Sequence, residues 1–145
     1  MREARQGPEK ASGLSVAGVA RRGDTLFIAR RLAGGSLGGK WEFPGGKAEA
    51  GESGEEALAR EFREEFSLPI QVGEELARAV FTHNGVKRNL RAYLIRFEGA
   101  DPSQAVLADH EEWKWAPVEE IERLDFAPSD MKILPALKAY LKAKP

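Results

Sequence analysis

Residues 45–69 read GGKAEAGESGEEALAREFREEFSLP, a glycine-rich loop that leads directly into an amphipathic helix. Ser53 is a favourable N-cap, and Glu56 three residues later completes a capping box. Apolar side chains at four-residue spacing would bury one stripe of the helix: Leu58, Phe62 and Phe66. Pro69 ends the helix because proline lacks a backbone N–H. The segment therefore predicts a loop and a helix that together organise the rest of the chain.

The same helix carries an unusual number of acids on one face. Glu61, Glu64 and Glu65 stand at i, i+3 and i+4, so their carboxylates share a face, and Glu52 lies just upstream. Like charges at this spacing repel each other, and a hard cation such as Mg2+ would convert the repulsion into coordination. Two interpretations follow from the spacing alone, a metal site or a solvated charged face.

The whole pattern resembles the Nudix box, a motif of metal-dependent hydrolases. The matching positions run from the loop to the helix end, namely Gly46, Glu52, Arg60, Glu61, Phe62, Glu64, Glu65, Ser67 and Leu68. Two positions depart from the family pattern: Phe62 replaces an aliphatic residue, and Ser67 replaces a glycine at the helix C-terminus, where glycine eases a left-handed turn. Neither change removes an acid. The resemblance implies an α+β fold, the Nudix-type α/β/α sandwich with a mixed β-sheet.

Composition agrees with a single globular domain. The 145 residues are 42% hydrophobic and 31% charged, which is typical of a globular protein with one core. A net charge of −1 provides no basic surface for a nucleic acid polymer, so a small phosphorylated partner is expected instead. The absence of cysteine excludes disulfides and thiolate chemistry. No apolar stretch suggests a signal peptide or a membrane span, and we expect a cytoplasmic protein without membrane contact.

Outside the box, alternation and turn residues predict mainly strands. Residues 1–11 are polar and are expected to form a mobile tail, and residues 12–145 the Nudix domain. The expected strands cover residues 14–20, 25–30, 70–72, 75–82, 86–97 and 111–116, with Asn84-Gly85 as a hairpin turn. Residues 33–40 are predicted to be a glycine-rich loop, residues 117–121 a short helix, and residues 129–142 a closing helix. The sequence leaves the choice between monomer and homodimer open.

The resemblance also implies which residues hold the metal. It assigns Mg2+, with Mn2+ as a substitute, to Glu61, Glu64 and Glu65, joined by the Gly45 carbonyl, with Glu52 as an additional or supporting acid. Arg60 is expected to orient these acids by ion pairing, and a simple helix salt bridge is a compatible role.

A second acidic cluster, residues 109–112, precedes Trp113. Family members often carry here an acid that binds metal or accepts a proton from water. Asp109 is the first candidate and Glu111 the second, and an exposed acidic loop is the alternative. We expect His110 to be a loop residue or a supporting partner rather than a ligand, and His83 to be structural.

Two further segments bear on the substrate. Residues 41–46 and 126–130 resemble those of the MutT-like and CTP pyrophosphohydrolases, and the resemblance places Asp130 where a base-reading Asn or Asp is found. An aspartate accepts hydrogen bonds from an exocyclic amine such as that of cytosine, and donates one when it is protonated. Phe43 offers the base an apolar face, and Arg31, favoured over Arg30 by register, offers charge to phosphate or base. The alternatives are a core aromatic for Phe43 and a helix-start acid for Asp130.

These features predict an enzyme: a Mg2+-dependent hydrolase that converts a nucleoside triphosphate to the monophosphate and pyrophosphate. Cytosine or oxidised guanine nucleotides are the expected substrates, consistent with nucleotide-pool sanitation. Two alternatives remain. One is hydrolysis of another nucleoside diphosphate-linked compound, either a dinucleoside polyphosphate or a nucleotide sugar. The other is a non-catalytic module that binds a nucleotide or a protein; that interpretation predicts loss of the acids, all of which are present here.

Overall fold

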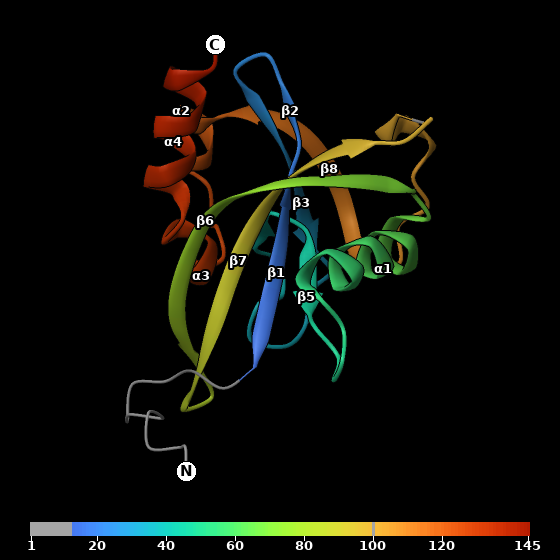
Figure 1. Cartoon of the computed structure of the whole chain (residues 1–145), viewed down its shortest axis with the longest axis vertical. Helices are drawn as coiled ribbons and strands as arrows, with labels where there is room; N and C mark the ends of the chain where they lie inside the picture. The colour runs from blue at the N-terminus through green and yellow to red at the C-terminus, as the bar shows by residue number, and fades with distance from the viewer. Residues whose placement is uncertain (1–12, 100) are drawn as a thin grey trace.

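Two four-stranded β-sheets and the helices around them build the computed structural model, which describes residues 13–99 and 101–145 (Figure 1). The first sheet has the order β5 (Gly45–Lys47), β1 (Leu14–Val19), β7 (Val86–Phe97) and β6 (Ile70–His83). The second contains β2 (Arg21–Arg22), β3 (Thr25–Arg31), β4 (Trp41–Glu42) and β8 (His110–Pro117). The α-helices are α1 (Gly54–Phe66), α2 (Val118–Ile121), α3 (Pro128–Met131) and α4 (Leu134–Ala143), with a short 3-10 helix at Pro102–Gln104. The mobile tail predicted for residues 1–11 lies outside the described residues.

The first sheet is mixed, as predicted. Strand β1 runs parallel to β7 and antiparallel to β5, and β7 pairs with β6 in a long hairpin. Asn84 and Gly85 both have positive φ, 51° and 79°, which suits a tight two-residue hairpin turn. The strands predicted at residues 70–72 and 75–82 are one strand, β6, because its register shifts near Glu75 interrupt the alternation without ending the pairing.

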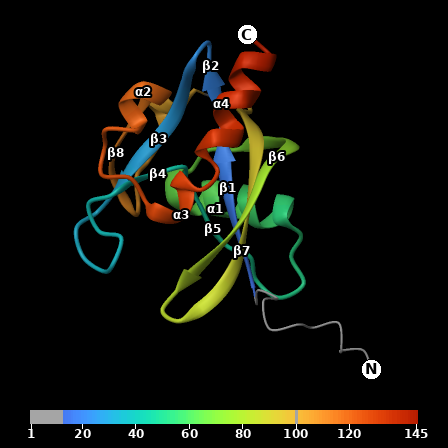
Figure 2. The same ribbon diagram turned by 90° about the vertical axis from the view of Figure 1, so that its left-hand side faces the viewer.

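Helices cover both faces of the first sheet, which gives the α/β/α sandwich (Figures 1 and 2). Helix α1 contacts β1, β5 and β6, whereas α3 and α4 contact β6 on the side where the C-terminal helices gather. The core is correspondingly divided into two clusters. One joins the α1 stripe to the sheet through Val16, Leu58, Phe62, Phe66, Tyr93 and Ile95. The other joins the C-terminal helices to the opposite face through Ala17, Leu90, Ala92, Leu134 and Leu137.

Helix α1 begins and ends where its sequence predicts. The Ser53 hydroxyl accepts the Glu56 backbone N–H at 3.0 Å, and the Glu56 carboxylate accepts the Ser53 backbone N–H at 2.9 Å, so the predicted capping box is confirmed. At the other end Ser67 adopts the left-handed conformation, with φ 55° and ψ 35°. A serine therefore makes the turn for which glycine is the favoured residue.

The closing helix predicted for residues 129–142 is instead two helices, α3 and α4. Ala127, rather than Ser129, is the N-cap of α3. Pro135 lies in the first turn of α4, and a proline in the middle of one continuous helix would remove a hydrogen bond and clash with the preceding turn. The break has a useful consequence, because it leaves Asp130 inside a short helix that faces the first sheet. Of the helices described, none has the length and apolar character that crossing a membrane requires.

Candidate active site

A pocket of about 270 Å³ opens between the two sheets, next to the glycine loop and α1. It is lined by several of the residues predicted from the sequence, namely Arg31, Phe43, Gly45, Glu61, Glu65 and Asp130. Among the described residues, the other predicted side chains lie outside its lining: Glu52, Arg60, Glu64, Asp109 and Glu111. The pocket therefore joins part of the acidic helix face to the segment predicted to bind a base.

The glycine loop lies against the acids without side chains of its own. A Cβ added at Gly46 would stand 2.3 Å from Glu61 Oε2, and one at Gly45 would stand 1.9 Å from the Val16 carbonyl oxygen. Only glycine permits these approaches. The pairing of β5 with β1 holds the loop in place, with Gly45 opposite Ala17 and Gly46 opposite Val16. Backbone groups of the loop are thus brought directly beside the Glu61 carboxylate.

Arg60 organises the acids from behind the pocket. Its Nε and Nη2 donate to the two Glu52 oxygens at 2.7 and 3.0 Å, and Nη2 also donates to the Lys47 carbonyl at 3.0 Å. Its Nη1 lies 3.2 Å from Glu64 Oε1 and 3.3 Å from Glu61 Oε2. The hydrogen bonds from Arg60 and from the Glu49 N–H lower the pKa of Glu52 to about 2, and the bond to Glu52 raises the pKa of Arg60. Glu52 therefore fixes the position of the Arg60 side chain, which also contacts Glu61 and Glu64.

The three helix acids differ sharply in exposure. Glu65 is buried at 7% exposure, the Glu61 side chain is 14% exposed, and the Glu64 side chain is 60% exposed. Burial raises the pKa of Glu65 to about 9, with further contributions from the charges of Glu42 and Glu61. Burial also raises the pKa of Glu61. The acidic face is therefore graded, from a solvent-facing carboxylate to one that is protonated near neutral pH in the absence of a cation.

These acids fit a divalent metal ion. Glu65 Oε1 is buried and has no hydrogen-bond partner within the described ranges of the chain. A buried carboxylate oxygen in that position is costly unless a donor or a cation satisfies it. Carboxylate and carbonyl oxygens are the ligands that Mg2+ prefers, and of the residues predicted to hold it, Gly45, Glu61 and Glu65 line the pocket.

Asp130 also lines the pocket, where it is buried and hydrogen-bonded to the backbone just after β4. Its Oδ2 accepts the Phe43 N–H at 2.9 Å, and Ser129 Oγ lies 3.5 Å from Oδ1. Burial, with the nearby charge of Glu42, raises the pKa of Asp130 to about 7. Phe43 lines the pocket and also packs on Phe126, with ring centroids 5.1 Å apart, so its core and pocket roles coexist.

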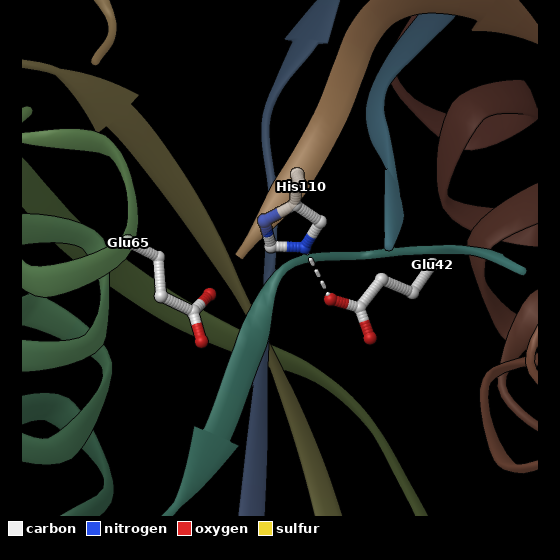
Figure 3. Close-up of side chains that lie close together, drawn as sticks. All are labelled: Glu42, Glu65 and His110. Atoms are coloured by element: carbon white, nitrogen blue, oxygen red, sulfur yellow. Dashed lines mark hydrogen bonds and ion pairs between the residues drawn. The ribbon is translucent and has the colours of Figure 1, made fainter. Parts of the chain in front are cut away.

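Sequence reasoning missed Glu42, and of the two roles it gave His110, a loop residue or a supporting partner, the loop is wrong. His110 is not in a loop; it is the buried first residue of β8, and its Nε2 lies 2.7 Å from Glu42 Oε2 (Figure 3). Glu42 is buried at 8% exposure, lines the pocket, and also lies 3.4 Å from Arg31 Nη1. One local signal pointed to Glu42, a charged residue between the buried aromatics Trp41 and Phe43. No local signal identifies His110, because its partner is distant in sequence.

In the second acidic cluster, the two candidate acids Asp109 and Glu111 have different neighbours. Glu111 lies 3.1 Å from Arg30 Nη2, and Arg30 also pairs with Glu112, so these side chains form a surface network away from the pocket. The negative charge of Asp109 contributes to the raised pKa of Glu65, which indicates that Asp109 lies near the acidic face. Of the two candidates, Asp109 is better placed to act with the helix acids.

Basic side chains complete the pocket at its open end. Lys47, His83 and Arg88 line it together with Arg31. Arg88 is anchored, because its Nε donates to Ser15 Oγ at 3.1 Å and its Nη2 to the Leu14 carbonyl at 3.1 Å. Sequence reasoning did not select Lys47 or Arg88, and it gave His83 only a structural role. The positive charges of Arg31, Lys47 and Arg88 provide an environment suited to phosphate groups.

An α/β/α sandwich in which a glycine loop and an acidic helix meet at one pocket matches a known family. Residues 11–137 match the family model described as the NUDIX domain, and the chain therefore belongs to the Nudix family. It is a Nudix-type hydrolase that resembles the MutT-like and CTP pyrophosphohydrolase members.

Individual relatives cover most of the chain. It is 37% identical over 122 residues to a protein of Mycobacterium tuberculosis (strain H37Rv) named "Putative 8-oxo-dGTP diphosphatase 2", covering 79% of this chain and 80% of that protein. It is 34% identical over 131 residues to the CTP pyrophosphohydrolase of Escherichia coli K12, covering 90% and 94%. Among solved structures, the E. coli ORF135 protein superposes with a TM-score of 0.79 at 32% identity, covering 93% and 94% of the two chains. The MutT protein of Methanosarcina mazei Go1 gives a TM-score of 0.76 at 25% identity, covering 96% and 100%.

Proposed function

We propose that this chain hydrolyses a nucleoside triphosphate to the nucleoside monophosphate and pyrophosphate. The observation that carries the proposal is the pocket itself, whose lining brings helix acids together with a buried aspartate and an aromatic ring. Such a pocket suits a molecule with a phosphate chain and a base. The relatives named for CTP and for 8-oxo-dGTP support the same class of substrate.

Mg2+ is the proposed cofactor, with Mn2+ as a substitute, held by Glu61, Glu64, Glu65 and the Gly45 carbonyl. Bound there, the ion would neutralise phosphate oxygens and lower the pKa of water. Glu52 contributes through Arg60, which keeps the Glu61 and Glu64 carboxylates within reach of one guanidinium. Arg31, Lys47 and Arg88 are proposed to pair with the remaining phosphate charge.

The reaction breaks one P–O bond between the α- and β-phosphates and forms one between phosphorus and the oxygen of water. Water gives up a proton as it attacks, and an acid of the site must accept it. Asp109 is proposed for this role outside the helix, because it acts electrostatically on Glu65. Glu111 is the weaker candidate, because it is paired with Arg30 on the surface.

Asp130 is proposed to read the base. With Oδ2 held by the Phe43 N–H and Oδ1 3.5 Å from Ser129 Oγ, an ionised Asp130 keeps acceptor capacity for an exocyclic amine. Cytosine nucleotides, which present such an amine at the end of the ring, are therefore the first candidates, and oxidised guanine nucleotides the second. Phe43 contributes an apolar wall beside this acceptor.

The test is pyrophosphate release, with and without Mg2+, from canonical, methylated-cytosine and oxidised-guanine nucleoside triphosphates. The expected result is Mg2+-dependent release of pyrophosphate with a clear ranking of bases. Release of phosphate alone, or no turnover of any triphosphate, would contradict the proposal. Dinucleoside polyphosphates and nucleotide sugars would then be assayed next, and nucleotide binding without turnover would indicate a binding module.

A further inference from the structure

A compact group of potential ligand atoms lies beside the pocket, which Glu42 and Glu65 line and His110 does not. It consists of Glu42 from β4, Glu65 from α1 and His110 from β8 (Figure 3). One carboxylate oxygen of each acid and one imidazole nitrogen lie within 4.8 Å of one another. All three residues are more than nine-tenths buried, with exposures of 8%, 7% and 3%. Three segments far apart in sequence thus deliver potential metal ligands to one buried point.

One edge of this group is already in contact. His110 Nε2 lies 2.7 Å from Glu42 Oε2, a separation similar to that between neighbouring ligands around one ion. The ring plane of His110 is fixed by stacking on Phe66, with centroids 4.9 Å apart and an interplanar angle of 19°. Since Phe66 belongs to the buried stripe of α1, the imidazole is held by the core and is not free to turn away.

The third member, Glu65, has one carboxylate oxygen without a partner in the described part of the chain. Glu65 Oε1 is buried and has no hydrogen-bond partner in the described part of the chain, and Figure 3 shows the Glu65 carboxylate lying beside the His110–Glu42 pair. Leaving a buried carboxylate oxygen unsatisfied carries a free-energy cost. A cation that bridges Glu65 to the pair would remove that cost.

Local charge also favours a cation. Glu42, Glu65 and Asp130 are three buried acids. The guanidinium of Arg31 forms an ion pair with one of them, Glu42, at 3.4 Å. The Arg31 side chain is 33% exposed and can pair with phosphate at the pocket entrance. A divalent ion would be bound by the carboxylates of Glu42 and Glu65 in exchange for any proton that they hold.

We propose that Glu42, Glu65 and His110 form a second metal site that binds a divalent transition metal ion such as Zn2+, Co2+ or Mn2+. An imidazole nitrogen suits these ions, whereas Mg2+ prefers oxygen ligands and keeps its waters. Ligand distances of about 2.0–2.2 Å to zinc require the hydrogen bond between His110 and Glu42 to open and the Glu65 side chain to move toward the pair. The inference goes beyond the proposed function, because binding at this site does not depend on triphosphate hydrolysis.

The test is a calorimetric titration of the full chain with Zn2+ in buffer without Mg2+, because the proposed Mg2+ site shares Glu65 with this group. We expect one strong Zn2+ site in the wild type and a loss of affinity of at least about 100-fold in His110→Ala, in line with the effect of losing a ligand or its support. His83→Ala is the matched control, because His83 is the only other histidine and lines the same pocket. Unchanged Zn2+ affinity in His110→Ala, or an equal loss in His83→Ala, would overturn the proposal.

Two further experiments make the result interpretable. If His110→Ala fails to fold, the imidazole nitrogen resonances of the wild type are followed by NMR during the Zn2+ titration. The resonances of His110 must move and those of His83 must not; a stationary His110 overturns the proposal. Glu64→Gln separates the two hypotheses, because it should abolish Mg2+-dependent turnover while leaving Zn2+ binding intact. Loss of turnover in the wild type would count against the proposed function and not against this site.

Discussion

Asp130 and Phe43 are joined by a hydrogen bond of 2.9 Å between the aspartate Oδ2 and the phenylalanine N–H, across 87 positions of sequence. The bond ties the C-terminal helices to the strand exit that leads into the glycine loop. It also orients the one carboxylate that we propose to read the base. The residue that selects the substrate is thus held by the same segment that delivers the chain to the metal site.

The first prediction concerns base selection. Asp130→Asn keeps a side-chain carbonyl for the Phe43 N–H but replaces an ionisable oxygen by an amide. We expect the ranking of nucleoside triphosphates by kcat/KM to change by about 10-fold or more, as is typical when a hydrogen-bonding group of a site is reversed. Turnover of the best substrate should still require Mg2+. An unchanged ranking would show that Asp130 serves only its helix.

The second prediction concerns stability and pH. The pKa of Asp130 is raised from 3.8 to about 7, so between these pH values the folded state holds a proton that the unfolded state has lost. Stability should therefore fall as pH rises through this window and stop falling above it. Asp130→Asn should remove this loss, on the order of 2 kcal/mol. Urea unfolding of both proteins in EDTA, at about pH 5 and about pH 8, measures it. Equal pH dependence in the two proteins would contradict the prediction.

The third prediction concerns the exposed metal ligand. Because the Glu64 side chain is 60% exposed, Glu64→Gln should fold normally. Turnover should nevertheless fall by about 100-fold or more, because a ligand proposed to hold the ion is lost. Glu55→Gln, another exposed acid on the same helix, is the control and should keep near-normal activity. Wild-type turnover in Glu64→Gln would exclude Glu64 as a ligand.

The fourth prediction concerns the arginine behind the acids. Arg60→Lys retains the charge but loses the two-pronged bond to Glu52 and the bond to the Lys47 carbonyl. We expect the free energy of unfolding to drop by about 1–3 kcal/mol and the Mg2+ concentration for half-maximal activity to rise. Arg63→Lys, at an exposed position on the same helix, should change neither quantity appreciably. If Arg60→Lys behaved like this control, the organising role would be wrong.

The fifth prediction concerns the departure from the family pattern at the helix end. Ser67 has φ 55°, a conformation that disfavours any residue with a Cβ. Ser67→Gly should therefore stabilise the protein by about 0.5–1 kcal/mol without changing activity, because the cap bonds are made by the backbone. Ser67→Ala keeps the Cβ and should show no gain. Thermal unfolding of the three proteins distinguishes these outcomes.

Local patterns predicted the parts of the fold that local forces determine. The capping box at Ser53 and the stripe of Leu58, Phe62 and Phe66 gave α1, and Asn84-Gly85 gave the hairpin. The prediction failed at residues 129–142, where apolar periodicity continued across Pro135 and the break into two helices was overlooked. A single interruption of the backbone leaves the helical spacing of apolar residues unchanged, but it breaks the ladder of backbone hydrogen bonds.

The site was predicted in part for the same reason. Glu61, Glu64 and Glu65 are neighbours on one helix, so their spacing alone brings them together. The pairing of Glu42 with His110 depends on β3, because β4 and β8 pair with opposite edges of that strand. A contact of this kind is created by sheet topology, and no window of sequence contains both partners.

The parallel pairing of β1 with β7 has a consequence for synthesis. Ser15 pairs with Leu90, so the central ladder of the first sheet forms only after β7 has been made. By then α1 has already been synthesised. The apolar rings of Phe62 and Phe66 on this helix stay uncovered until Tyr93 and Ile95 of β7 pack against them. A nascent chain paused between these elements presents an uncovered hydrophobic helix, which is the kind of surface that chaperones bind. The topology that assembles the pocket thus makes the incomplete chain a client of the folding machinery.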